Sequence, residues 1–92
     1  MHVNEIWEAH RSTDWPTDLG SQEGELMMID TVMSGCATYY LEAEDGLDPQ
    51  RREMLKSCVE DLENLLPDLD PSAEPYFQRL HQLGSLMLGT GL

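Results

Sequence analysis

The chain has 92 residues, of which 18 are Asp or Glu and five are Lys or Arg, so its formal net charge at pH 7 is −13 with neutral histidines. Binding to nucleic-acid backbones and to anionic membranes depends on clusters of Lys and Arg, so this balance argues against both kinds of partner. The acidic charge has three remaining interpretations: it confers solubility, it steers a basic protein partner, or it mimics nucleic acid toward a nucleic-acid-binding protein.

A chain of this length predicts one domain, here a single helical domain over residues 1–92. No segment approaches the run of ~18 apolar residues needed to span a bilayer. The first residues, Met1 to Glu5, have neither a basic start nor an apolar stretch of the secretory type. We therefore expect a cytoplasmic protein, in which the two cysteines encounter a reducing environment.

Residues 1–20 predict an N-terminal arm with a short helix at about residues 4–10. Its side chains follow the helical spacing i, i+3, i+4 and i+7 at Val3, Ile6, Trp7 and His10. Asn4 is the candidate N-cap, and Trp15 precedes Pro16, which favours extended backbone. Because each tryptophan can bury about 150–250 Å², we expect the arm to pack on the bundle or on a partner subunit.

A long helix is predicted at about residues 22–43, with Ser21 as its N-cap. Its apolar side chains form two stripes: Leu26, Ile29, Met33, Cys36 and Tyr40, and then Met28, Val32 and Tyr39. A helix apolar over this much of its circumference has neighbours on more than one side. Gly35 inside it predicts close approach of another helix, or of a second subunit, at this level.

A second helix is predicted at about residues 49–66, because Asp48-Pro49 is a strong helix start and Pro67 a stop. Folded back on the turn at residues 43–48, the two helices form an antiparallel hairpin. Residues at the same level along the hairpin then have sequence numbers whose sum is nearly constant. Four apolar pairs fulfil this condition: Cys36–Cys58, Met33–Leu62, Tyr40–Leu55 and Ile29–Leu65.

Cys36 and Cys58 are therefore predicted to face each other across the hairpin. One interpretation is that both are reduced, inert core residues. The other is a disulfide or redox-sensitive thiol pair, since facing helices are just close enough for the bridge.

A third helix is predicted at about residues 74–88, stopped by Gly89. Gly84 inside it either frays the helix or lets another backbone come near. Methionines of the first and third helices, Met27, Met28, Met33 and Met87, together with tyrosines, are either core residues or the lining of a groove for a small ligand.

The charges of the second helix oppose its dipole, with Arg51 and Arg52 in the first turn and acidic residues in the last two. Arg51 and Arg52 are expected to pair with Glu42 or Glu44 across the turn. We predict a partner-binding surface made of the acidic residues at the other end of the helix and in the connector: Glu60, Asp61, Glu63, Asp68 and Asp70.

Enzymatic and metal signatures are weak. There is no phosphate-cradling glycine loop and no CxxC pair. His2, Glu5 and His10 are spaced along one helix, but no second ligand pair accompanies them, and His81 is expected to be a half-buried surface residue. We predict no catalytic residue, no cofactor and no metal site.

The sequence thus predicts an all-α fold: an antiparallel hairpin, a third helix packed on it and an N-terminal helix or arm, as a three-helix bundle or a dimeric four-helix type of bundle. The expected function is a non-enzymatic, acidic protein–protein interaction module that acts as an adaptor, regulator or inhibitor and forms a homodimer. The alternatives are a nucleic-acid-mimicking inhibitor of a basic protein and a bundle that binds a small ligand in a groove lined by Met and Tyr.

Overall fold

The computed structural model describes residues 2–17, 19–43 and 46–89, and all regular elements in these ranges are helical. The four α-helices are α1 (Val3–Arg11), α2 (Glu23–Glu42), α3 (Pro49–Leu65) and α4 (Glu74–Leu88). Two 3₁₀ turns accompany them, η1 (Gly20–Gln22) before α2 and η2 (Leu66–Asp68) after α3. The all-α fold predicted from the sequence is confirmed.

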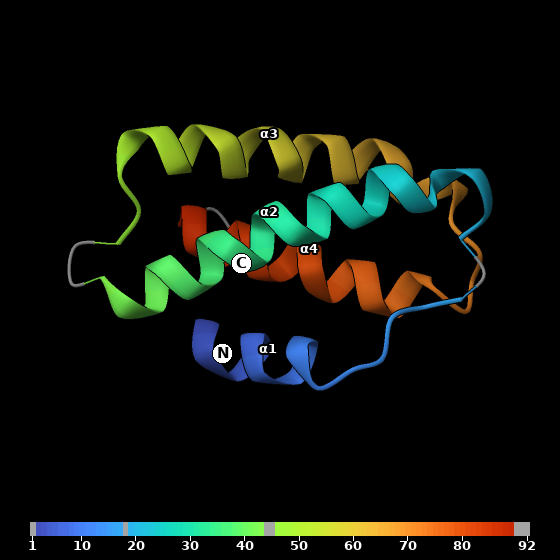
Figure 1. The fold of residues 1–92 in the computed structure, drawn as a ribbon, viewed down its shortest axis with the longest axis horizontal. Coiled ribbons are helices and arrows are strands. Elements are labelled where there is room, and N and C mark those ends of the chain that lie inside the picture. The colour runs from blue at the N-terminus through green and yellow to red at the C-terminus, as the bar shows by residue number, and fades with distance from the viewer. Residues whose placement is uncertain (1, 18, 44–45, 90–92) are drawn as a thin grey trace.

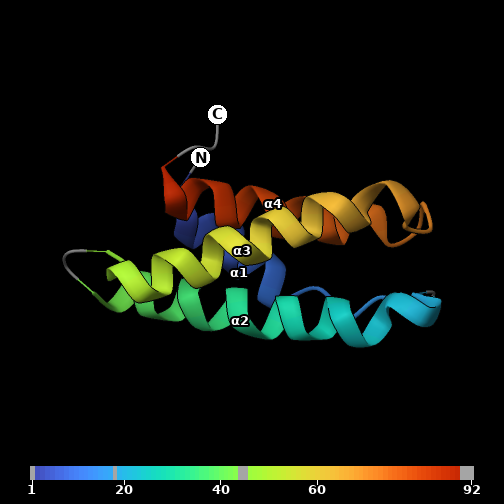
Figure 2. The same ribbon diagram turned by 90° about the horizontal axis from the view of Figure 1, so that it is seen from above.

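The hairpin of α2 and α3 forms one half of the bundle, and α4 packs against both of its helices (Figures 1 and 2). The N-terminal α1 packs on α2 and α4, on the side of this pair that faces away from α3 (Figure 1). The described part of the N-terminal arm therefore packs on the bundle of its own chain. As a result α2 has three helical neighbours.

The core is built from one apolar stripe of each long helix. Most of the first predicted stripe of α2 is buried, and it meets buried side chains of α3 and α4; together these are Leu26, Ile29, Met33, Cys36, Leu55, Val59, Leu62, Phe77, Leu80 and Leu83. Burying one such aliphatic or aromatic side chain contributes about 1.5–3 kcal/mol. The second stripe differs, because Met28 is 63% exposed and Val32 and Tyr39 are only half-buried.

The register of the hairpin differs from the predicted one. The Cys36 thiol donates a hydrogen bond to the carbonyl oxygen of Arg51, with 3.9 Å between sulfur and oxygen. Arg51 precedes Cys58 by about two helical turns, so Cys36 lies closer to the start of α3 than predicted and the Cys36–Cys58 level is wrong. A constant sum requires parallel axes, whereas α2 and α3 cross at an angle (Figure 1).

Gly84 marks a close approach between α4 and the hairpin. A Cβ atom at this position would lie 2.5 Å from Met33 Cε and 2.7 Å from Val59 Cγ2. Gly84 therefore makes room for side chains of α2 and α3, whereas the sequence predicted either fraying of the helix or the approach of another backbone. The close approach predicted at Gly35 is wrong within this chain, because a Cβ atom there would meet no atom of another described element within 4 Å.

The observed helix boundaries lie close to the predicted ones, whereas two of the predicted N-caps are wrong. The Asp48 carboxylate accepts a hydrogen bond from the Arg51 amide at 2.8 Å, as expected for an N-cap, and Gly89 ends α4 with a φ of 77°. Ser21 is not the cap of α2, because it lies inside η1. Asn4 is not the cap of α1 either, because α1 begins at Val3 after extended backbone at His2.

Candidate functional site

The predicted acidic surface lies at one end of the bundle. The antiparallel order of the helices brings the end of α3 and the starts of α2 and α4 to this end, on the right of Figure 1. The five predicted residues are all exposed and belong to the last turns of α3, to η2 and to the turn before α4: Glu60, Asp61, Glu63, Asp68 and Asp70. Glu23 and Glu25 in the first turn of α2 lie at the same end. We call this set of seven residues the acidic end.

Two of the predicted residues are engaged within the fold. Asp70 accepts hydrogen bonds from the hydroxyl and the amide of Ser72 at 2.7 and 2.9 Å. These bonds lower the pKa of the Asp70 carboxyl, so that it stays ionised. Glu63 Oε1 lies 3.1 Å from Nε2 of the half-buried His81. Within the described part of the chain, no hydrogen bond or ion pair joins Asp61 or Asp68 to another side chain.

The arginines of α3 are bound at the opposite end of the bundle. The Arg51 guanidinium pairs with the Asp48 carboxylate at 2.5 Å and lies 3.9 Å from the centre of the Tyr39 ring. Arg52 donates a hydrogen bond to the carbonyl oxygen of Leu88 at 2.6 Å, near the end of α4.

The predicted pairing of these arginines across the turn is therefore wrong for Glu42, because the N-cap carboxylate and a helix-end carbonyl are closer acceptors. Glu44 lies outside the described residues. Arg79 is also committed to the fold, since it donates to the Ala9 carbonyl at 3.3 Å and to the Thr13 hydroxyl at 2.8 Å. Three of the five cationic side chains thus hold helix ends or the N-terminal arm in place.

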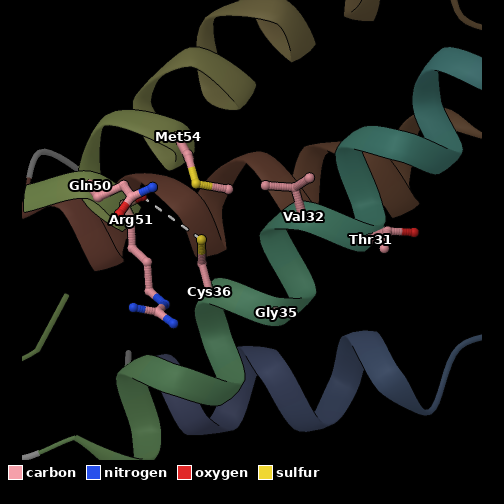
Figure 3. Close-up of a pocket in the computed structure, with 7 residues that line it drawn as sticks. All are labelled: Thr31, Val32, Gly35, Cys36, Gln50, Arg51 and Met54. Carbon is pink, nitrogen blue, oxygen red and sulfur yellow. Dashed lines mark hydrogen bonds between the residues drawn. The ribbon is translucent and has the colours of Figure 1, made fainter. Parts of the chain in front are cut away.

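A shallow groove of about 380 Å³ lies between α2 and the start of α3 (Figure 3). Its lining is Thr31, Val32, Gly35, Cys36, Gln50, Arg51 and Met54. Met54 and Val32 extend toward each other across it, while the Arg51 guanidinium points away from them (Figure 3).

The groove differs from the predicted Met/Tyr-lined one. Of the four predicted methionines, Met33 and Met87 are buried in the core, whereas Met27 and Met28 are exposed. None of the four lines this groove, and the lining contains no tyrosine.

Both cysteines are free thiols in the structure. Cys36 is buried against the start of α3 and Cys58 is half-buried on the same helix. Burial raises the pKa of each thiol, and for Cys36 the nearby Arg51 offsets part of that effect. Because the nucleophile is the thiolate, this environment keeps both cysteines weakly reactive at neutral pH.

A buried polar cluster joins the N-terminal arm to the bundle, and the sequence analysis missed it. His10 is 2% exposed, and its Nε2 lies 2.6 Å from Asp30 Oδ1. The Tyr76 hydroxyl donates to Asp30 Oδ2 at 3.5 Å, and the His10 and Tyr76 ring centres are 4.6 Å apart. The Trp15 ring packs edge-on against Tyr76 at 5.6 Å. The cluster has a structural role, because it fastens the arm.

One sequence signal could have pointed to this cluster. Asp30 is the single charged residue between Leu26 and Leu41, in an otherwise uncharged stretch of α2. A lone carboxylate in such a stretch has a partner where it is removed from water. His10 occupies the apolar face of α1 and is the matching residue.

The described residues contain no group of three or more His, Cys, Asp or Glu side chains placed to hold a metal ion. His10, weighed above as a metal ligand, is engaged by Asp30. None of the described helices combines the length and the apolar character needed to cross a membrane.

Comparison with known proteins finds no matching family model, no matching curated protein and no matching solved structure.

Proposed function

We propose that the protein is a non-enzymatic interaction module, an adaptor, regulator or inhibitor, that binds a basic surface of another protein through its acidic end. The observation that supports this proposal is the gathering of acidic residues at one end of the bundle, away from Arg51 and Arg52. The fold gathers two acidic segments at one end, while Arg51 and Arg52 are bound at the other. Among the described residues, Asp61 and Asp68 at the acidic end are therefore left without a cationic partner.

The orientation of α3 adds a physical reason for such a partner. Glu60, Asp61 and Glu63 lie near the carboxyl end of the helix, where its dipole is negative, so their charges are unfavourable there. Lys or Arg side chains of a partner would relieve this repulsion on binding. Because the carboxylates are exposed, the attraction acts mainly on the association rate and is screened by salt.

The proposal is tested by affinity capture from the native source with three forms of the chain. They are the wild type, Glu60→Lys/Asp68→Lys at the acidic end, and Glu5→Lys/Asp14→Lys on the N-terminal arm. The two variants have the same net charge and differ only in where the charge is reversed. A protein that binds the acidic end is captured by the wild type and the arm variant, is lost with the acidic-end variant, and elutes at moderate salt. Equal capture by all three forms would contradict the proposal.

The same experiment addresses nucleic-acid mimicry. If the captured protein is a nucleic-acid-binding protein, duplex DNA or RNA added to the beads competes with the acidic end and releases it. A partner that stays bound when nucleic acid is added uses a different basic surface. The adaptor and mimic forms of the proposal are separated by this step.

A further inference from the structure

The N-terminal helix α1 is attached to the rest of the bundle by few buried side chains. Of its apolar residues only Ile6 is buried. Val3 and Trp7 are half-buried, and Ala9 is exposed. The largest fully buried side chains of the described chain all belong to α2, α3 and α4. Because the stability gained by packing follows the apolar area removed from water, α1 contributes little to the core that holds the other three helices together.

The centre of this attachment is polar. His10 is 2% exposed, and its Nε2 lies 2.6 Å from Oδ1 of Asp30 on α2. Its Nδ1 atom is also buried, and no described group forms a hydrogen bond with it. A buried polar atom without a partner costs stability, and in water both imidazole nitrogens would be hydrated. The polar contact therefore narrows the free-energy difference between attached and detached α1.

The second polar attachment of the arm lies at the surface. Arg79 on α4 donates hydrogen bonds to the Ala9 carbonyl at 3.3 Å and to the Thr13 hydroxyl at 2.8 Å, and both are exposed to solvent. Exposed bonds of this kind are exchanged for bonds to water at little cost. They orient α1 and add little to the free energy of its attachment.

The segment after α1 determines how far detachment extends. Residues 12–14 connect α1 to Trp15 and form no helix. The Trp15 ring packs edge-on against Tyr76 and Phe77 of α4, with ring centres 5.6 and 5.7 Å apart, and Leu19 is buried. The backbone can therefore bend at residues 12–14 while the chain from Trp15 onward stays packed on α4.

The length of α1 makes its detachment a single step. It has nine residues, and isolated helices shorter than about 12–15 residues are marginal in water. Once α1 leaves the bundle, its helix therefore unfolds as well. Its backbone amides then become exposed together, and not one by one from the chain end.

We propose that α1 is a local unfolding unit, which detaches from α2 and α4 while these two helices and α3 stay folded and packed. Detachment uncovers Asp30 and Tyr76 on the side of the bundle that faces away from α3 (Figure 1). The buried polar contact of His10 sets how often this opening occurs. The opening needs no partner and is independent of binding at the acidic end, whose residues lie outside α1.

Amide hydrogen exchange of the full chain, measured by NMR at several low urea concentrations, tests the proposal. The amides of residues 7–11 are expected to share one opening free energy with little dependence on urea. They should exchange about tenfold or more faster, relative to their unfolded rates, than the amides in the middle of α2 and α4. Amides of α1 that open only together with those of α2 and α4 would overturn the proposal. A steady increase in protection from residue 7 to residue 11 would indicate fraying and would also overturn it.

Variants of the polar contact test what sets the opening. Asp30→Asn keeps the side-chain shape and removes the charge from the hydrogen bond, so it should increase opening of α1 about tenfold. His10→Phe/Asp30→Ala/Tyr76→Phe makes the whole contact apolar at nearly constant volume, so it should decrease opening about tenfold. An apolar variant whose α1 opens as often as that of the wild type, or more often, overturns the proposed role of the polar contact.

Glu8→Gln is the matched control on α1. It removes one charge from an exposed ion pair with Arg11, outside the buried contact. Opening of α1 in this variant should stay within about threefold of the wild type. An increase as large as that of Asp30→Asn would mean that exposed contacts hold α1 in place, and it would overturn the role given to His10 and Asp30.

Discussion

His10 and Asp30 form the polar contact that fastens the N-terminal helix to the bundle. His10 Nε2 lies 2.6 Å from Asp30 Oδ1, and the histidine is almost fully buried between Trp7 and Tyr76. The other ring nitrogen, Nδ1, is buried without a hydrogen-bond partner in the described structure. The two residues are 20 positions apart in the sequence and lie on different helices, so their contact acts on tertiary packing and not on local helix formation.

Replacing His10 by Ala is expected to destabilise the fold by about 1–3 kcal/mol, because Asp30 loses its partner in a site that is largely closed to water. The change is measured by urea unfolding followed by tryptophan fluorescence, since Trp7 and Trp15 both lie beside the cluster. Arg11→Ala is the control, because it removes an exposed ion pair with Glu8 and should cost less than about 0.5 kcal/mol. Equal destabilisation by both variants would mean that the buried contact adds nothing beyond a surface pair.

The helices were predictable because each has a strong local signal. Asp48-Pro49 starts α3, Gly89 ends α4, and apolar spacing marks the interior of α2. The N-caps of α1 and α2 were not predictable, because packing determines where these helices begin. Leu19 is buried, and the chain reaches α2 through the η1 turn. Tertiary contacts override capping preferences of this size.

The pairing of residues between helices was the least predictable feature. The Cys36–Cys58 level assumed parallel axes, and the observed crossing of α2 and α3 moves Cys36 to Arg51. The His10–Asp30 contact depends on where the arm docks, for which the sequence has no periodic signal. The acidic end follows from the order of the helices alone, so the sequence sufficed to locate it. The second apolar stripe of α2 was visible in the sequence, but the sequence did not show which of the two stripes is buried.

Tyr76 predicts a loss of stability in alkali. Burial, together with the Asp30 charge and the hydrogen bond to it, raises the pKa of the Tyr76 phenol to about 12. A pKa above the unfolded value of about 10 means that the neutral phenol contributes stability below pH 10, and that this contribution is lost as the pH rises toward 12. Unfolding free energies measured between pH 9 and pH 12 should fall for the wild type and fall less for Tyr76→Phe. The pH titration of phenolate absorbance should lack the step near pH 12 in Tyr76→Phe. A titration curve unchanged by this substitution would contradict the assignment of the raised pKa to Tyr76.

Asp48 predicts a separate loss in acid. Hydrogen bonds from the backbone and side chain of Arg51 lower the pKa of its carboxyl below the ordinary 3.8. The carboxylate therefore stabilises the start of α3 above about pH 4, and this contribution is lost as the pH falls through the lowered pKa. Asp48→Asn keeps a capping oxygen and loses the ion pair, whereas Asp48→Ala loses both. Melting temperatures at pH 7 should decrease in the order wild type, Asp48→Asn, Asp48→Ala. The differences between them should shrink at pH 2. An Ala variant as stable as the wild type at pH 7 would show that the cap has no role.

Gly84 and Gly35 predict opposite effects of the same substitution. Gly84→Ala places a methyl group 2.5 Å from Met33 Cε and 2.7 Å from Val59 Cγ2, so the core must shift, at a cost of about 1–3 kcal/mol. Gly35→Ala places it in open space on a helix, where alanine is favoured over glycine by about 0.5–1 kcal/mol. Both are measured by urea unfolding at the same low protein concentration as the wild type. Destabilisation at Gly35 would mean that the space beside it is filled. Stabilisation at Gly84 would mean that α4 packs less closely on Met33 and Val59 than the structure has it.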